Sequence, residues 1–417
     1  MERRARFGNR WGLLGVVAVA LAALLAWSGA AMAQEITFWV IDSFTRSLDA
    51  PLYQAIRQFE QANPGIRVVV EPAPANAIHD RIVTSIIGGE GPDVVALDIA
   101  WAGEFITMGL LQDLTPYVAP IADEYFDGPM AVLQSNGRYY AVPWYTNNVA
   151  LYYNKDIFAA AGIEGPPATW DEFYAAARKL KDAGYYALSL ARGGFGTYFF
   201  ISFLYQNGGQ VFADDGRTLV FNSPEAVEAF EWFTGLYTEL KAVPDTIMSA
   251  FSWDEVYAPF LQGRAAMFIS GDWARFTVEQ NAPHINWGVA PLPAGKRRAT
   301  VAGGYNLAIG ANSRNREAAW KLIEFLTGPQ GEGMLLEYGR IPARKDILTS
   351  EAALQDPFFA LFIEQAEYGV PQPTHPAWLR LNNIIGDAFD AVIQGLKTPK
   401  QALDDAVREG QAVVDSM

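Results

Sequence analysis

The chain has 417 residues, of which 51% are hydrophobic and 18% charged, so it can bury large cores and is not intrinsically disordered. Its formal net charge of −15 argues against nucleic acid or an anionic membrane surface as a partner. No cysteine is present, which excludes disulfides, catalytic thiols and Cys-ligated zinc. The histidines, His79, His284 and His375, are far apart, so we expect no His-rich metal site and no cofactor, while an all-oxygen calcium site stays open.

The first 33 residues have the pattern of an export signal. Arginines cluster before residue 11, an uncharged apolar run covers residues 11–27, and the small-residue sequence Ala31-Met32-Ala33 follows. We predict a signal peptide over residues 1–33, cleavage after Ala33 and a periplasmic mature protein. The alternative is an uncleaved membrane anchor, because the apolar run approaches spanning length.

The chain after the signal alternates strand and helix patterns, beginning with strands over residues 36–41, 66–70 and 92–97 and helices over 48–61 and 77–87. This alternation predicts βαβ units with mostly parallel strands. Ligands of such open sheets bind beyond the carboxyl ends of the strands. Asp98 follows the third predicted strand, and Asp42 and Ser43 follow the first, so these polar residues are candidate ligand contacts.

Residues 139–158 form the most distinctive stretch of the chain. Two β-rich runs, 139–142 and 149–153, flank a short polar passage, and Pro143 is expected to pull the chain out of any ladder because it lacks an N–H. Residues 144–148 then offer two aromatic rings and several neutral hydrogen-bonding groups. This mixture suits a pocket for a polyhydroxylated ligand, but an aromatic-rich strand pair in a core explains it equally well.

A second α/β unit follows. Thr169 and Glu172 form a capping box that opens a helix to about residue 182, and Asp272 is a possible N-cap of a later helix. Further strands are predicted at 185–190, 265–269, 287–290 and 305–309. Further helices are predicted at 223–240, 253–261, 315–326, 331–338, 351–368, 378–393 and 399–414, the last opening with a capping box at Thr398.

The common signatures of catalysis are missing. No phosphate-binding loop, G-x-S-x-G elbow or H-E-x-x-H sequence is present. Gly303-Gly304 marks either a close backbone approach or a ligand contact through an amide, and Trp273 is either a packing residue or a stacking platform. A pair of carboxylates suitable for glycoside hydrolysis cannot be recognised from sequence alone.

Taken together, these segments resemble the family 1 extracellular solute-binding proteins, the sugar-binding components of ATP-driven importers, and within them the trehalose/maltose-binding branch. The resemblance covers residues 35–414. Its order and spacing are specific, although each segment is weak alone. The segments that carry it are residues 91–94, 96–101, 140–156, 169–173, 207–209, 260–267, 289–293, 303–309 and 339–342.

The resemblance implies roles for particular positions. Asp98 matches an acid that bonds sugar hydroxyls, Tyr145 an aromatic contact and Trp273 a stacking ring. Gly304 and Tyr305 match a pair that offers a backbone N–H and a ring face.

Three positions depart from the family pattern. Asn147 falls where relatives often carry Asp, Gln372 where they often carry Arg, and Arg275 where some carry an aromatic residue. Arg275 could pair with an acidic ligand group or with Asp98. These departures leave the identity of the sugar open.

The resemblance also implies an α/β fold of two lobes, the type II periplasmic binding protein fold, with a mainly parallel sheet flanked by helices in each lobe and a ligand cleft between them. We expect residues 34–146 with 303–345 in the N-terminal lobe and 147–302 with 346–417 in the C-terminal lobe. The predicted function is periplasmic sugar capture by hinge closure and delivery to a membrane permease, by a monomer that catalyses nothing. The alternatives are a secreted glycoside hydrolase and a binder of a non-sugar solute such as a polyamine or a metal chelate.

Overall fold

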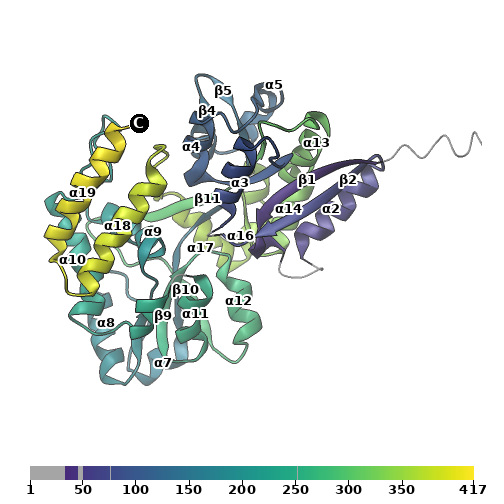
Figure 1. Ribbon diagram of the computed structural model, residues 1–417. Helices are drawn as coiled ribbons and strands as arrows, with labels where there is room; N and C mark the ends of the chain where they lie inside the picture. Colours follow the sequence, from purple (N-terminus) through teal and green to yellow (C-terminus); the bar gives the residue numbers. More distant parts are fainter. Residues whose placement is uncertain (1–32, 46–49, 76, 251) are drawn as a thin grey trace, which may run out of the picture.

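The computed structural model describes residues 33–45, 50–75, 77–250 and 252–417. Two β-sheets with helices around them build the molecule, and in Figure 1 the strands β9 and β10 lie below β11. The predicted signal segment falls outside the described residues except for Ala33, so its cleavage remains a prediction. No helix in the described part of the chain is long and apolar enough to cross a membrane.

The larger sheet has seven strands in the order β12-β6-β11-β3-β1-β2, with β13 also paired to β11, and the smaller has four in the order β10-β7-β9-β8. A short hairpin of β4 (Gln134–Ser135) and β5 (Arg138–Tyr139) stands apart. The strands of the larger sheet are β1 (Gln34–Ile41), β2 (Ile66–Ala73), β3 (Val94–Asp98), β6 (Ala141–Asn148), β11 (Thr300–Ile309), β12 (Ile341–Pro342) and β13 (Gly369–Pro371). Those of the smaller sheet are β7 (Ala150–Asn154), β8 (Tyr186–Ser189), β9 (Ala265–Ser270) and β10 (Trp287–Ala290).

Both sheets are mixed, which corrects the prediction of mainly parallel sheets. Strand β1 pairs parallel with β2 and β3, as the βαβ pattern requires, but β11 runs antiparallel to both β3 and β6. In the smaller sheet only β8 and β9 are parallel, because β7 runs antiparallel to β9 and β10. Strands β7 and β11 each come directly after the chain changes sheets, with no crossover helix before them.

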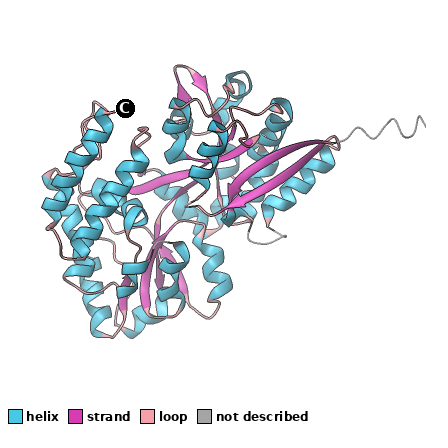
Figure 2. Ribbon diagram, in the orientation of Figure 1, coloured by secondary structure: helices cyan, strands magenta, loops and turns pink. Residues whose placement is uncertain are grey.

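Helices surround both sheets, as Figure 2 shows. Helices α13 and α14 pack against each other and against α2 beside the larger sheet, while α8 and α11 pack on the smaller one. Helices α9, α10, α18 and α19 pack together, and α9 also contacts β11 of the larger sheet. The long helices are α2 (Pro51–Ala62), α3 (Ile78–Ile87), α8 (Trp170–Asp182), α9 (Gly193–Gln206), α10 (Pro224–Thr238), α11 (Trp253–Leu261), α12 (Ala274–Asn281), α13 (Arg316–Thr327), α14 (Pro329–Glu337), α17 (Pro357–Ala366), α18 (Trp378–Ile393) and α19 (Pro399–Asp415). The shorter ones are α4 (Ala102–Thr107), α5 (Thr115–Val118), α6 (Asp127–Ala131), α7 (Lys155–Ala160), α15 (Lys345–Leu348) and α16 (Glu351–Gln355).

Most predicted elements are confirmed, and the capping box at Thr398 is present with both of its hydrogen bonds. Helix α9 was not predicted. Its first turn contains Gly193, Gly194 and Gly196, and most of its remaining residues are buried, so it shows neither a helical start signal nor a polar face. The predicted helix over residues 351–368 is divided into α16 and α17 at Asp356, because Pro357 begins a new helix at its first position.

The prediction for Pro143 is wrong. Strand β6 runs continuously through this proline, which lies opposite Asn306 of β11. The register between the two strands shifts between Tyr305 and Asn306, so a bulge lies beside Pro143. A proline is tolerated inside a sheet where a bulge removes the need for its missing N–H.

A single residue, Val149, separates β6 of the larger sheet from β7 of the smaller one. Its backbone is bound twice by Thr300 at the start of β11, since the Thr300 hydroxyl donates to the Val149 carbonyl at 2.7 Å and accepts from its N–H at 3.2 Å. Two passages of the chain are therefore tied together where they leave one sheet for the other.

Candidate ligand-binding site

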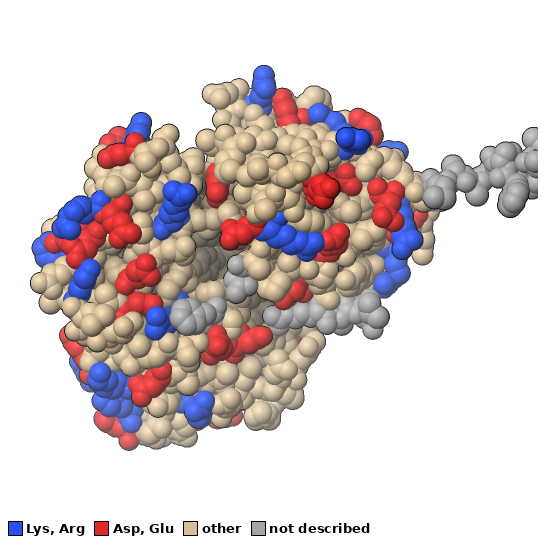
Figure 3. Space-filling view, in the orientation of Figure 1, with Lys and Arg blue, Asp and Glu red and all other residues tan. Residues whose placement is uncertain are grey.

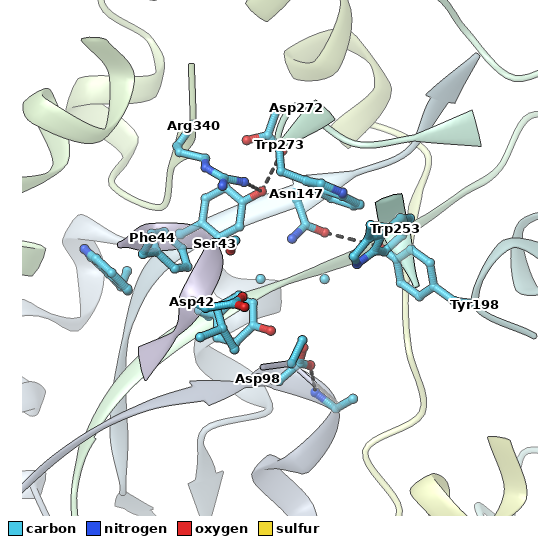
Figure 4. A pocket seen from close by; sticks show the side chains of 18 of the residues that line it. Asp42, Ser43, Phe44, Asp98, Asn147, Tyr198, Trp253, Asp272, Trp273 and Arg340 are labelled. Carbon is cyan, nitrogen blue, oxygen red and sulfur yellow. Dashed lines mark hydrogen bonds between the residues drawn. The ribbon is translucent and has the colours of Figure 1, made fainter. Parts of the chain in front are cut away.

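A cavity of about 1050 Å³ lies between the two sheets. Figure 3 shows the molecule hollowed near the middle of one face, and Figure 4 shows the cavity from close by. Its lining comes from the ends of β1, β3 and β6 and the middle of β11 on the larger sheet, and from α9, α11, α12 and the turn before α12 on the other side. Segments far apart in the sequence thus face one space.

All of the predicted site residues except Arg275 line this cavity. Asp98 and Asp272 lie at opposite sides of it in Figure 4, and the side chain of Asn147 lies between them. The structure therefore brings together, in one lining, Asp42, Ser43, Asp98, Tyr145, Asn147, Trp273, Gly304, Tyr305 and Gln372.

Arg275 has a different environment from the one suggested by sequence. Its guanidinium binds Glu279 at 3.0 Å and Asp356 at 2.8 Å, and its Cζ lies 4.8 Å from the ring centroid of Phe358. It does not pair with Asp98. The sequence could not reveal this, because Asp356 and Phe358 belong to the start of α17, some 80 residues further along the chain.

Asp98 ends β3, where Tyr305 of the neighbouring strand β11 is its register partner. The carboxylate accepts a hydrogen bond of 2.9 Å from the Ala100 N–H. Burial raises the pKa of Asp98 to about 6, although hydrogen bonds from Ala100 and Tyr305 and the charge of His79 act to lower that pKa. A buried carboxylate with few donors of its own is suited to accept hydrogen bonds from a ligand.

His79 also lines the cavity, and its side chain is held by two carboxylates. Its Nδ1 is 2.8 Å from Asp80 and its Nε2 is 3.0 Å from Glu104. Burial alone would lower the pKa of His79, but its hydrogen bonds to Glu104 and Asp80 outweigh burial and raise that pKa. In the part of the chain that the structure describes, no cluster of three or more His, Asp or Glu side chains could hold a metal ion.

A second polar network crosses between the sheets. The Tyr145 hydroxyl on β6 donates to Asp272 Oδ1 at 2.7 Å, and Arg340 Nη1 donates to the Tyr145 hydroxyl at 3.4 Å. The Arg340 guanidinium also lies over the rings of Phe44 and Tyr145, at 5.1 and 5.3 Å. Burial raises the pKa of Asp272 to about 7, against the lowering effect of the Arg340 charge. Asp272 is therefore not the N-cap that the sequence suggested, because its carboxylate binds Tyr145 and makes no cap hydrogen bond to α12.

The neutral amides of the site are oriented by aromatic residues. The Tyr198 hydroxyl on α9 donates to Asn147 Oδ1 at 3.3 Å, and the Trp378 indole N–H donates to Gln372 Oε1 at 3.3 Å. Because the amide oxygens are thus engaged, the amide NH₂ groups are the ones available as donors.

Gly304 is required by a close backbone approach. Its φ is +148°, and a Cβ at this position would lie 2.1 Å from the carbonyl oxygen of Tyr145 on β6. No other residue could adopt this conformation without strain. This confirms the packing explanation of the glycine pair, and Gly304 also lines the cavity.

Aromatic rings face the cavity from both sides. On one side, Trp253 makes an edge contact with Trp273 at 5.1 Å and another with Tyr198 at 6.3 Å. On the other side, Phe44 and Tyr305 make an edge contact at 5.9 Å. Large apolar faces with a few buried polar groups between them are typical of small-molecule sites.

The sequence analysis missed several residues of this lining. Arg340 lies in a segment that carried the family resemblance but was given no role, and Tyr198 lies on the unpredicted helix α9. Trp253 follows Ser252, the N-cap of α11, and an aromatic residue at a helix start was the one available signal. No pattern in the sequence pointed to His79 or Phe44.

Two helix-covered sheets with a ring-lined, partly polar cavity between them define a two-lobe binding protein of type II. The chain belongs to the bacterial extracellular solute-binding proteins, whose family model matches residues 42–333. It is 28% identical to the maltotriose-binding protein of Pyrococcus abyssi, over 82% of this chain and 74% of that protein, and 27% identical to the diacetylchitobiose-binding protein of Streptomyces coelicolor, over 88% and 87%.

Solved structures agree with this assignment. An ABC transporter solute-binding protein from Thermotoga lettingae, bound with α-D-tagatose, superposes with a TM-score of 0.84 at 27% identity, covering 92% of this chain and all of that one. The maltose-bound MalE3 of T. maritima gives a TM-score of 0.82 at 28% identity, covering 91% of this chain and all of that one.

Proposed function

We propose that this protein is the carbohydrate-binding component of an ABC importer, capturing its ligand in the cavity between the two sheets. The observation that carries the proposal is the lining itself, in which the rings of Trp253 and Trp273 face the same space as the carboxylate of Asp98 and the amide of Asn147. Sugars present apolar C–H faces and a rim of hydroxyl groups. Such a lining offers both a ring to stack on and acceptors and donors for the hydroxyls.

The size of the cavity favours an oligosaccharide over a single sugar. Its volume of about 1050 Å³ is slightly above the range of about 300–1000 Å³ for small-molecule sites. The names of the relatives agree, since they include proteins that bind maltotriose and diacetylchitobiose.

Hinge closure is the proposed mechanism. A ligand that touches both sides of the cavity favours the closed arrangement by its differential affinity for that state. Residues 34–146 with 303–345 and residues 147–302 with 346–417 are the lobes we propose to move. The one-residue passage at Val149 lies between strands of the two sheets and is a natural place for the rotation.

The remaining features of the proposal follow from the sequence. Export by a signal peptide cleaved after Ala33 would place the protein in the periplasm as a monomer, where the closed form meets membrane permease subunits. We propose no catalytic step.

A thermal-shift screen tests the proposal, because a ligand that binds only the folded state raises its melting temperature by mass action. We expect stabilisation by oligosaccharides such as maltotriose, diacetylchitobiose, arabino- or galactooligosaccharides. Spermidine, as a representative polyamine, and metal chelates should give none. Incubation with the stabilising sugar should release no new reducing ends. Stabilisation by polyamines alone would reject the carbohydrate assignment, and turnover of the sugar would indicate a hydrolase.

A further inference from the structure

Three tyrosine hydroxyls hold the turn that precedes Trp273. The Tyr257 hydroxyl is 2.9 Å from Ser270 Oγ, the Tyr152 hydroxyl donates to the Gly271 carbonyl at 2.7 Å, and the Tyr145 hydroxyl donates to Asp272 Oδ1 at 2.7 Å. Three successive residues are thus each bound by a different tyrosine.

The tyrosines come from three different elements. Tyr152 lies on β7, Tyr257 on α11, and Tyr145 on β6 of the opposite sheet. All three are almost fully buried. Three buried hydrogen bonds from different elements restrict the conformation of this turn, although Asp272 Oδ2 is buried without a hydrogen-bond partner among the described residues.

The orientation of the Trp273 ring depends on this turn. A Cβ at Gly271 would lie 1.9 Å from Cζ3 of the indole, so the ring folds back directly over that glycine. The indole Nε1 is buried and has no hydrogen-bond partner among the described residues. The ring is therefore oriented by the turn beneath it and by its edge contact with Trp253, and not by a hydrogen bond of its own.

We propose that Tyr145, Tyr152 and Tyr257 are positioning residues that hold Trp273 in the orientation needed for stacking on a ligand. Preorganisation of this kind strengthens binding because the ring does not have to be ordered when the ligand arrives. Tyr145 adds a link between the lobes, since its hydroxyl reaches Asp272 from the opposite sheet. The stacking of Trp273 on a ligand rests on the proposed function, whereas the orientation of its ring in the ligand-free protein does not.

Tyr152 gives the sharpest test, because it does not line the cavity and cannot touch a ligand there. The matched control is Tyr125, another buried tyrosine, whose hydroxyl donates to the Thr327 carbonyl at 2.8 Å away from the cavity. Both Tyr→Phe changes remove one buried hydroxyl and keep the ring.

The first measurement uses the ligand-free protein labelled with 5-fluorotryptophan and ¹⁹F NMR, with the Trp273 signal assigned from Trp273→Phe. We expect Tyr152→Phe to shift or broaden the Trp273 signal and Tyr125→Phe to leave it unchanged. Tyr257→Phe provides a second test if Tyr152→Phe does not fold. An unchanged Trp273 signal in the folded variants, or an equal response to Tyr125→Phe, would overturn the proposal.

The second measurement is the affinity, by titration calorimetry, for the oligosaccharide that gives the largest thermal shift. Tyr152→Phe should weaken binding by about threefold to tenfold, the loss expected for one hydrogen bond, and Tyr125→Phe by less than about twofold. Equal affinities of Tyr152→Phe and wild type would overturn the positioning role. A wild type that binds no sugar at all would instead reject the proposed function, while the ¹⁹F result would still decide how Trp273 is held.

Discussion

The two sides of the cavity differ in what they offer a ligand. The larger sheet contributes the carboxylate of Asp98 and the amide of Asn147, together with rings such as Tyr305, whereas the side formed around the smaller sheet contributes the rings of Trp253 and Trp273 and a carboxylate, Asp272, that is already bound to Tyr145. The carboxylate of Asp98 and the rings of Trp253 and Trp273 therefore line the same cleft from opposite sides. A ligand that uses both must contact both sides, so recognition and closure become one event.

The largest effect is expected from removing a ring that faces Asp98 across the cleft. Trp273→Ala should weaken oligosaccharide binding at least tenfold, because it removes a ring face from the cavity, while the melting temperature of the free protein falls only slightly. Trp320→Ala is the matched control, since this buried tryptophan stacks on Tyr117 outside the cavity. It should lower the melting temperature clearly, by the loss of about 3–5 kcal/mol of core packing, without changing affinity. Calorimetric titration and thermal melts of both variants decide the matter, and equal affinities of Trp273→Ala and wild type would refute the stacking role.

A smaller effect should come from acidification, which acts on Asp98 of the larger sheet. Burial raises the pKa of Asp98 to about 6, so between pH 7 and pH 5 most of its ionised, acceptor form is lost and affinity should fall by up to about tenfold. Stability should change in the opposite direction. Because burial raises the pKa values of Asp98 and Asp272 above 3.8, to about 6 and 7, their contribution to stability is lost as the pH rises through those values.

Affinity and melting temperature between pH 5 and pH 8 test both trends in wild type and Asp98→Asn. The variant should bind the sugar weakly, and its affinity should depend little on pH. Between pH 5 and pH 8 its melting temperature should fall less than that of the wild type, because the variant has no carboxyl group at position 98 to ionise. An affinity of the wild type that does not change with pH would show that the ionised form of Asp98 is not used.

The smallest effect is expected at Arg275. Its guanidinium is already engaged by Glu279 and Asp356 outside the cavity lining, so Arg275→Gln should change sugar affinity by less than about twofold. The loss of these partly exposed ion pairs should cost about 0–1 kcal/mol of stability. Neutral sugars and uronates should be titrated side by side, and a selective loss of uronate binding would restore the role that the sequence suggested for this residue.

Local patterns predicted most of the fold, because strand alternation, capping residues and turn glycines depend on neighbours in the chain. Asp98 was found in this way, from its place after a buried strand. The direction of β11 could not be found, since antiparallel pairing with β3 depends on where the chain returns after about 200 residues. Pro143 was misjudged for a similar reason, because the bulge that accommodates it requires the partner strand.

The candidate site was predictable where a position matched the family and unpredictable where a contact depends on distant packing. Asn147 and Trp273 were placed in the cavity lining correctly by position, but Arg275 was assigned a partner without knowledge of α17. Arg340 was missed because a half-buried arginine gives no signal until the neighbouring rings of Phe44 and Tyr145 are seen beside its guanidinium.

The single residue between β6 and β7 has a consequence for protein engineering. The chain passes from one sheet to the other at Val149 and returns to the larger sheet with β11, and the C-terminal helices α18 and α19 then pack on α10. Neither half is therefore one continuous stretch of sequence. A chimera that exchanges one half with a relative, in order to transplant its sugar preference, therefore needs several junctions. One of these must preserve the paired hydrogen bonds of Val149 and Thr300, so both residues should be taken from the same parent.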